Sequence, residues 1–224
     1  MIQVSRVWSE RGVKGGVKMT LLSALMAAIG LSSFGLSACS KEEEEATEWD
    51  NWQQRNEAYF ASLADSLSSN PAQWQRLKLF SLDPATEGKA TDYVYAKTIE
   101  SGSGSSCPAY TDSLLVIYQG RLIPTATYPQ GYVFDTTVSG TFSITTGNVV
   151  KQVLSQMIDG YATALQHMHS GDHWRIYIPS DLGYGAVDNS NVNVRAYSTL
   201  IFDVQLVGFS HAGNPLPAWS ARRR

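Results

Sequence analysis

Residues 150–168 read VKQVLSQMIDGYATALQHM, and this stretch decides the fold class. Its apolar side chains recur at spacings of three and four residues, which predicts a helix with one buried face. They are Val150, Val153, Leu154, Met157, Ile158, Tyr161, Leu165 and Met168. Gly171 follows, and glycine is typical just beyond a helix C-terminus. We therefore expect one helix over residues 150–168.

Short β-rich runs lie on both sides of this predicted helix. Their side chains alternate between apolar and polar or are continuously apolar, and β-branched and aromatic residues are common in them. The runs are 92–100, 112–119, 132–135, 141–145, 173–179 and 197–209. Several antiparallel strands interrupted by one helix predict an α+β fold rather than a repeat of βαβ units.

An N-terminal helical extension is predicted over residues 48–91, ahead of the domain of residues 92–209. Its apolar residues over 48–69 have helical spacing, and Asn70-Pro71 ends the run. A second short helix is expected over 72–80. These helices either pack on the flank of the domain, which we favour slightly, or join two copies in a homodimer. Residues 210–224 are expected to form a disordered tail.

The chain begins with the pattern of an export signal. Residues 1–18 contain four basic side chains, and residues 19–36 are apolar and uncharged. Leu36-Ser37-Ala38-Cys39 resembles the lipobox of bacterial lipoproteins. The resemblance implies that residues 1–38 are removed and that a lipid on Cys39 anchors the protein to a membrane. A single-pass anchor is the less favoured alternative.

An acidic tether is expected over residues 39–47, because Glu42–Glu45 is a run of like charges that favours extended chain. The run is also similar to the acidic tags of surface-exposed lipoproteins of the Bacteroidetes. The sequence thus predicts an anchored protein, and we expect it in the outer membrane. It leaves the periplasmic and the surface-exposed face equally open.

Composition excludes several other classes of function. The 224 residues carry a net charge of −3, and the part from Cys39 onward has 13 basic and 19 acidic residues, which argues against a nucleic-acid partner. The two cysteines, Cys39 and Cys107, define no disulfide framework. No Gly-x-Ser-x-Gly elbow marks a hydrolase. Gly102-Ser-Gly104 is followed by no helix, so we expect no phosphate-bearing cofactor.

A metal site is also not expected. The three histidines at 167, 169 and 173 form the only histidine cluster of the sequence. Two of them are two residues apart at a predicted helix end, so their rings point in different directions and do not converge on one ion.

Six segments, in chain order, resemble the FKBP-type peptidyl-prolyl cis-trans isomerases. They are VIYQG at 116–120, VFD at 133–135, MIDGY at 157–161, MHSG at 168–171, IPSDLGYG at 178–185 and STLIFDV at 198–204. The resemblance covers about residues 110–209 and implies a curved antiparallel sheet wrapped around a short α-helix. It also implies that this helix begins near Ile158, whereas the apolar spacing begins at Val150.

The same resemblance implies a substrate pocket built from nine residues. They are Tyr118, Phe134, Asp135, Phe142, Met157, Ile158, Tyr161, Tyr184 and Phe202. It makes Tyr161 the floor, Asp135 a hydrogen-bond acceptor, and the backbone N–H of Ile158 a donor to a bound carbonyl. Taken singly, each aromatic residue would pass for an ordinary core residue. The assignment of a pocket depends on the order in which all of them occur along the chain.

Two departures from the family pattern leave two functions open. Tyr161 stands where the family usually has tryptophan, and the loop of residues 191–197 lacks the family's proline. The first function is an isomerase that assists the folding of exported proteins and acts on proline-containing polypeptides. The alternative is a chaperone or binding module with the same fold and little turnover.

Overall fold

The computed structural model describes residues 47–218. The predicted signal peptide, Cys39 and the acidic run of Glu42–Glu45 lie outside the described residues. Within the described range, no helix is both long enough and apolar enough to span a bilayer.

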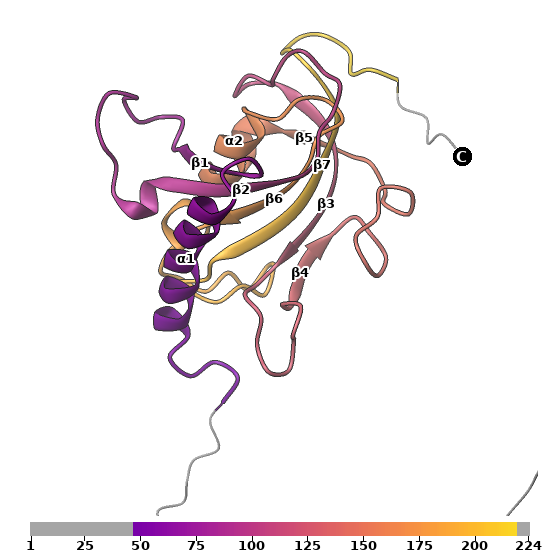
Figure 1. The fold of residues 1–224 in the computed structure, drawn as a ribbon. Coiled ribbons are helices and arrows are strands. Elements are labelled where there is room, and N and C mark those ends of the chain that lie inside the picture. The colour runs from indigo at the N-terminus through magenta and orange to yellow at the C-terminus, as the bar shows by residue number, and fades with distance from the viewer. Residues whose placement is uncertain (1–46, 219–224) are drawn as a thin grey trace, which may run out of the picture. The chain divides into compact units, whose positions relative to one another are not determined.

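One antiparallel sheet of seven strands forms the framework (Figure 1). The strands are β1 (Trp74–Lys78), β2 (Tyr93–Glu100), β3 (Ser113–Arg121), β4 (Val133–Thr136), β5 (Val150–Val153), β6 (His173–Ile178) and β7 (Leu200–Ser210). Their order is β1-β2-β6-β7-β3-β4, and β5 pairs with β3 beside β4. With the helices α1 (Trp52–Ser69) and α2 (Asp159–Leu165), the sheet confirms the predicted α+β class.

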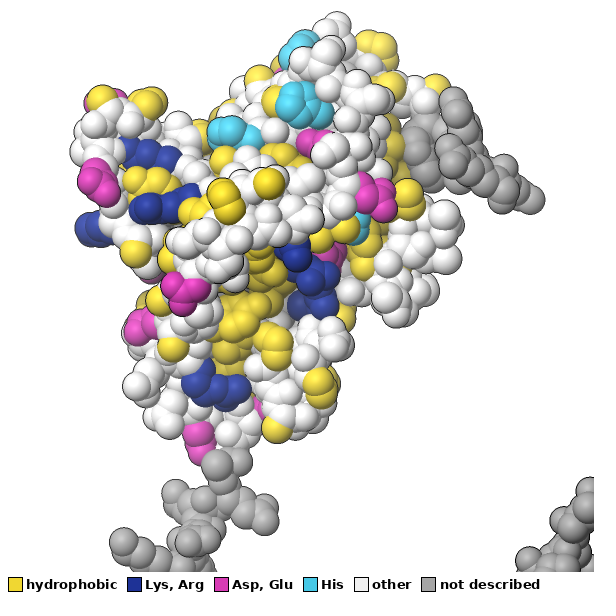
Figure 2. Space-filling model, in the orientation of Figure 1, with side chains coloured by type: hydrophobic (Ala, Val, Ile, Leu, Met, Phe, Trp, Pro, Cys, Tyr) yellow, Lys and Arg dark blue, Asp and Glu magenta, His cyan; other side chains and the backbone are white. Residues whose placement is uncertain are grey.

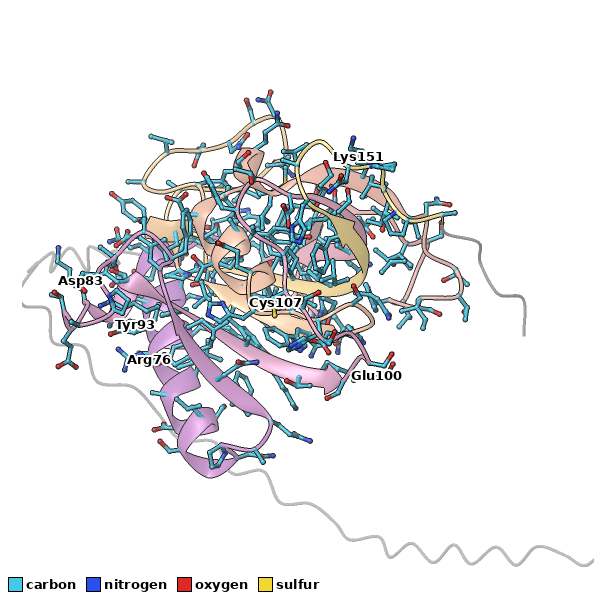
Figure 3. The ribbon with its side chains drawn as sticks, turned by 90° about the horizontal axis from the view of Figure 1, so that it is seen from above. Arg76, Asp83, Tyr93, Glu100, Cys107 and Lys151 are labelled. Carbon is cyan, nitrogen blue, oxygen red and sulfur yellow. The ribbon has the colours of Figure 1, made fainter. Side chains whose placement is uncertain are left out.

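The two helices lie on opposite faces of the sheet. Tyr161 of α2 packs against Phe202 of β7, while Phe60 of α1 packs against Tyr95 of β2. Side chains alternate between the faces along a strand, so Phe202 and Val204 lie on the α2 face and Asp203 lies on the α1 face. Figure 3, seen from above, shows α1 and α2 on the two sides of β2.

The predicted helix over 150–168 is wrong in its first half. Residues Val150–Val153 form β5, which pairs with Ser113–Val116 of β3, and Leu154–Gln156 form a short 3-10 turn. Pairing with β3 overrides the helical spacing, because a strand's preference depends on its neighbours. The helix that remains, α2, begins at Asp159, as the family resemblance implied.

Two further predictions of secondary structure are wrong. Residues 72–80 do not form a helix, because Trp74–Lys78 add β1 to the sheet beside β2. Residues 141–145 do not form a strand; they belong to a loop that a bridge between Val138 and Gly147 closes. The first predicted helix is confirmed as α1, whose buried residues Trp52, Phe60 and Leu63 pack on the chain's own core. Residues 211–218 contain no helix or strand.

Candidate active site

Four aromatic side chains from four elements meet on the α2 face, and we call them the aromatic cluster: Tyr118, Phe134, Tyr161 and Phe202. Phe202 lies at the centre. Its ring centroid is 5.2 Å from that of Tyr161, 5.5 Å from that of Phe134 and 6.4 Å from that of Tyr118. Tyr161 and Phe202 are buried, whereas Tyr118 and Phe134 are half-buried. The cluster therefore has an apolar floor and a side that reaches the surface.

Gly120 makes room for this arrangement. It is two residues after Tyr118 on β3, so it faces the same side of the sheet. A Cβ at Gly120 would lie 2.6 Å from Cζ of Phe134 and 2.8 Å from Cε1 of Phe202. The signal in the sequence is the glycine itself, because a glycine inside a strand often marks close approach of other groups.

A hydrogen bond joins the aromatic cluster to a carboxylate. The hydroxyl of Tyr118 donates to Oδ2 of Asp135 over 2.7 Å. Burial, and then this hydrogen bond, raise the pKa of Tyr118. Tyr184 packs against the same hydrophobic core, and burial and then the charge of Asp135 raise its pKa. Both phenols keep their protons at neutral pH and are hydrogen-bond donors.

Tyr161 forms the deepest part of the cluster. Its side chain belongs to the first turn of α2, and the residue is only 3% exposed. Its pKa is raised by burial and then by the nearby Tyr118 and Asp135. Its hydroxyl has no hydrogen-bond partner among the described residues. A buried donor is thus held at the floor without an acceptor.

Met157 and Ile158 lie immediately before α2 and are both half-buried. The carbonyl of Ile158 accepts the N–H of Ala162 and so starts the helix. The N–H of Ile158 makes no backbone hydrogen bond among the described residues. It therefore remains free to donate to another acceptor, three residues before Tyr161.

Phe142 is the exception among the nine predicted residues. Its ring stacks on His173 with centroids 4.6 Å apart and an interplanar angle of 23°. His173 pairs with Gln205 on β7 and so shares the α1 face with Asp203, opposite Phe202. The assignment of Phe142 to the aromatic cluster is therefore wrong. The error arises because residues 141–145 form a loop rather than the expected strand.

The α1 face carries a separate hollow of about 510 Å³, which Phe142 helps to line. Asp203, at its base, is bound by Arg121 and by both Nε and Nη2 of Arg175, at 2.8 and 3.2 Å. Figure 2 views this face and shows basic side chains beside apolar surface. Because the two arginines are committed to Asp203, this network joins β3, β6 and β7.

No group of three or more metal-ligating side chains occurs among residues 47–218. His167 contacts the carbonyl of Thr163 through Nδ1, and the N–H of His169 donates to Asp172. These histidines therefore take part in local hydrogen bonds at the C-terminus of α2.

Comparisons with known proteins find similarity to one family. Residues 104–207 match the family model of the FKBP-type peptidyl-prolyl cis-trans isomerases. The chain is 36% identical over 115 residues to a macrophage infectivity potentiator of Trypanosoma cruzi, covering 51% of this chain and 52% of that protein. It is 33% identical over 116 residues to the outer membrane protein MIP of Legionella longbeachae, covering 52% and 44%.

A third relative is the FKBP-type 22 kDa peptidyl-prolyl cis-trans isomerase of Escherichia coli. It is 32% identical over 111 residues, covering 50% of this chain and 47% of that protein. The chain spans about half the length of the curated relatives it matches.

Proposed function

Since residues 104–207 form a domain of the FKBP-type peptidyl-prolyl cis-trans isomerase family, we propose that this protein isomerises X-Pro peptide bonds in exported polypeptides. The observation that supports this most directly is the aromatic cluster, which joins an apolar floor to three hydrogen-bonding groups. These groups are the Tyr118–Asp135 pair, the Tyr184 hydroxyl and the free N–H of Ile158.

The cluster suits this reaction because isomerisation needs no nucleophile. Rotation about the C–N bond breaks amide resonance and crosses a barrier of about 18–20 kcal/mol. The rotated amide has less charge separation than the planar amide, so apolar surroundings favour it. The rings of Phe134, Tyr161 and Phe202 provide such surroundings. An environment that stabilises the rotated state more than the planar state accelerates the reaction.

The polar groups hold the substrate in place. In our proposal the N–H of Ile158 donates to a carbonyl of the substrate, and the protonated Tyr184 donates to a second. Asp135 is fixed by the Tyr118 hydroxyl at 2.7 Å. Fixed donors and acceptors cost little reorganisation when the amide rotates.

We expect purified protein to accelerate isomerisation of a prolyl tetrapeptide in a protease-coupled assay. Asp135→Leu removes the acceptor of the Tyr118 hydroxyl, and Phe202→Tyr places a hydroxyl at the centre of the apolar floor. Each variant should lower kcat/KM by about tenfold or more, since a tenfold change corresponds to about 1.4 kcal/mol. Phe142→Leu, on the opposite face, is the matched control and should retain wild-type kcat/KM.

Circular dichroism and thermal melting must first show that the variants fold, because a buried unpaired hydroxyl costs roughly 1–3 kcal/mol. Wild-type turnover in both cluster variants would contradict the residue assignment. Absence of acceleration by folded wild-type protein would leave the alternative, a binding module or chaperone. Tyr161 in place of tryptophan and the proline-free loop of residues 191–197 favour that alternative.

We also propose that the protein acts in the cell envelope, anchored through a lipid on Cys39. The signal-like residues 1–38 and a relative named as an outer membrane protein support this. Metabolic labelling with a radioactive fatty acid should mark the wild-type protein but not Cys39→Ala. Protease treatment of intact cells distinguishes the surface-exposed from the periplasmic face.

A homodimer through α1 stays a second proposal. The buried apolar residues of α1, Trp52, Phe60 and Leu63, pack on the core of their own chain and are not available to a partner. Sedimentation of a monomer at high protein concentration would exclude it.

A further inference from the structure

A loop of residues 183–199, which we call the rim loop, joins Tyr184 to the start of β7. It is folded back on itself by backbone hydrogen bonds. The N–H of Tyr197 donates to the carbonyl of Gly185 over 2.8 Å, and Asn189 and Val194 exchange two bonds of 2.7 and 3.0 Å. Because Tyr184 adjoins Gly185, the position of Tyr197 is linked directly to that of Tyr184.

The rim loop is also conformationally strained. Tyr197 has a φ of 60°, in the left-handed region that a bulky side chain seldom adopts, and Asn193 has a φ of 53°, which asparagine tolerates better. Such conformations persist only where surrounding contacts enforce them. The loop therefore depends on contacts from outside itself.

Helix α1 supplies these contacts at the C-terminal end of the loop. The indole N–H of Trp52 donates to Oγ of Ser198 over 2.9 Å. The N–H of Thr199 donates to Oδ1 of Asn56 over 2.7 Å, and the Thr199 hydroxyl donates to the carbonyl of Asn56 over 3.3 Å. Asn56 is 1% exposed, and Ser198 and Thr199 are each 2% exposed. This is a buried polar contact between segments more than 140 residues apart in the sequence.

Asn56 is itself fixed within α1, because its Nδ2 donates to the carbonyl of Trp52 over 2.7 Å. One turn of helix thus presents both groups that hold the loop. The guanidinium of Arg195 lies 4.6 Å from the ring centroid of Trp49, just before α1, and adds a second contact. At its other side, Asn193 donates to the hydroxyl of Tyr132 over 3.0 Å.

We propose that Asn56 and Trp52 are positioning residues for substrate binding. They hold the rim loop, and through it Tyr184, in the arrangement that binds a proline-containing chain. The inference rests on the proposed function and extends it, because α1 lies outside the matched family segment of residues 104–207. A loop ordered in advance loses less conformational entropy on binding, so its release raises KM more than it lowers kcat.

The test compares two α1 variants in the isomerase assay. Asn56→Ala leaves the Thr199 N–H without its acceptor and should raise KM by roughly three- to tenfold, the effect of one buried hydrogen bond, with kcat within about twofold of wild type. Leu63→Ala is the matched control. It removes a buried side chain about 10 Å further along the helix and should lower Tm without raising KM.

Equal KM values for Asn56→Ala and wild type would overturn the proposal. So would an equal KM increase in both variants, because α1 would then contribute only general stability. Trp52→Phe, which removes the bond to Ser198 but keeps the bonds of Asn56 and a ring at this buried position, gives a milder test if Asn56→Ala does not fold. It should raise KM by a smaller factor.

A second readout separates this inference from the proposed function. If wild-type protein shows no turnover, the Kd of a proline-containing peptide replaces KM, with the same expected ratios. Amide hydrogen exchange of Val194 and Tyr197 should be faster in Asn56→Ala than in Leu63→Ala. If these two amides exchange at the same rate in both variants, α1 does not hold the rim loop, and the proposal is overturned whether or not the protein is an active isomerase.

Discussion

Tyr161 shows how far a single position can be predicted. The family resemblance implies that it is the floor of a substrate pocket. In the structure its buried ring contacts Phe202, and its part in substrate binding stays a prediction. The unpaired hydroxyl could not be predicted, because it depends on which side chains surround it in space. The predicted position of Phe142 was wrong. The side of the sheet on which Phe142 lies depends on the conformation of the loop of residues 141–145, which the sequence pattern does not determine.

Replacing Tyr161 by phenylalanine should stabilise the protein. The hydroxyl of Tyr161 is buried without a partner, and such a group costs about 1–3 kcal/mol. We expect Tyr161→Phe to raise the free energy of unfolding in urea by about 1 kcal/mol. Tyr118→Phe is the control. It breaks the bond to Asp135 and should lower the same free energy by about 1 kcal/mol. Destabilisation of Tyr161→Phe would show that its hydroxyl has an acceptor.

Among the elements, the strands were predicted best. Alternation predicted β2, β6 and β7, and a continuously apolar run predicted β3, each within a few residues of its observed bounds. Prediction failed where pairing partners decide the conformation. Leu77 lies in residues 72–80, a run that is equally compatible with a short helix. In the structure Leu77 pairs with Val94, and its strand β1 forms the edge of the sheet. Residues 150–153 became a strand for the same reason.

The strand β1 should therefore contribute to the stability of the whole sheet. Leu77 is buried, and truncation of a buried leucine costs about 2–5 kcal/mol. We expect Leu77→Ala to lower Tm clearly, while Gln75→Ala on the same strand should change stability by less than about 0.5 kcal/mol. Equal melting temperatures for Leu77→Ala and wild type would mean that β1 is separate from the cooperative core.

At the level of the whole molecule, the α+β class followed from the sequence, as did α2 and every strand except β1 and β5. The position of α1 did not. Helical spacing reveals an apolar face but not what that face covers, so flank packing and dimerisation could not be distinguished. The α1 face of the sheet also hides a charged network around Asp203 that no local pattern indicates.

That network makes stability depend on pH through His173. Burial lowers the pKa of His173 below its ordinary 6.5, against the opposing charges of Asp203 and Glu100. The unfolded chain therefore binds a proton before the folded protein does, and stability falls as pH drops below about 6.5. His173→Phe can still stack on Phe142 and cannot titrate. It should lose less free energy of unfolding between pH 7.5 and 5.5 than wild type. An equal loss would contradict a role for this ring.

The pairing of β1 with β2 has a consequence for any shortened form of the protein. The edge strand β1 carries Arg76 and Lys78, and charged residues on an edge strand discourage another chain from pairing with it. A fragment that starts at residue 92 would lack β1, so the backbone amides and carbonyls on that edge of β2 would have no hydrogen-bond partners. Such a fragment should self-associate, even with every residue of the aromatic cluster intact.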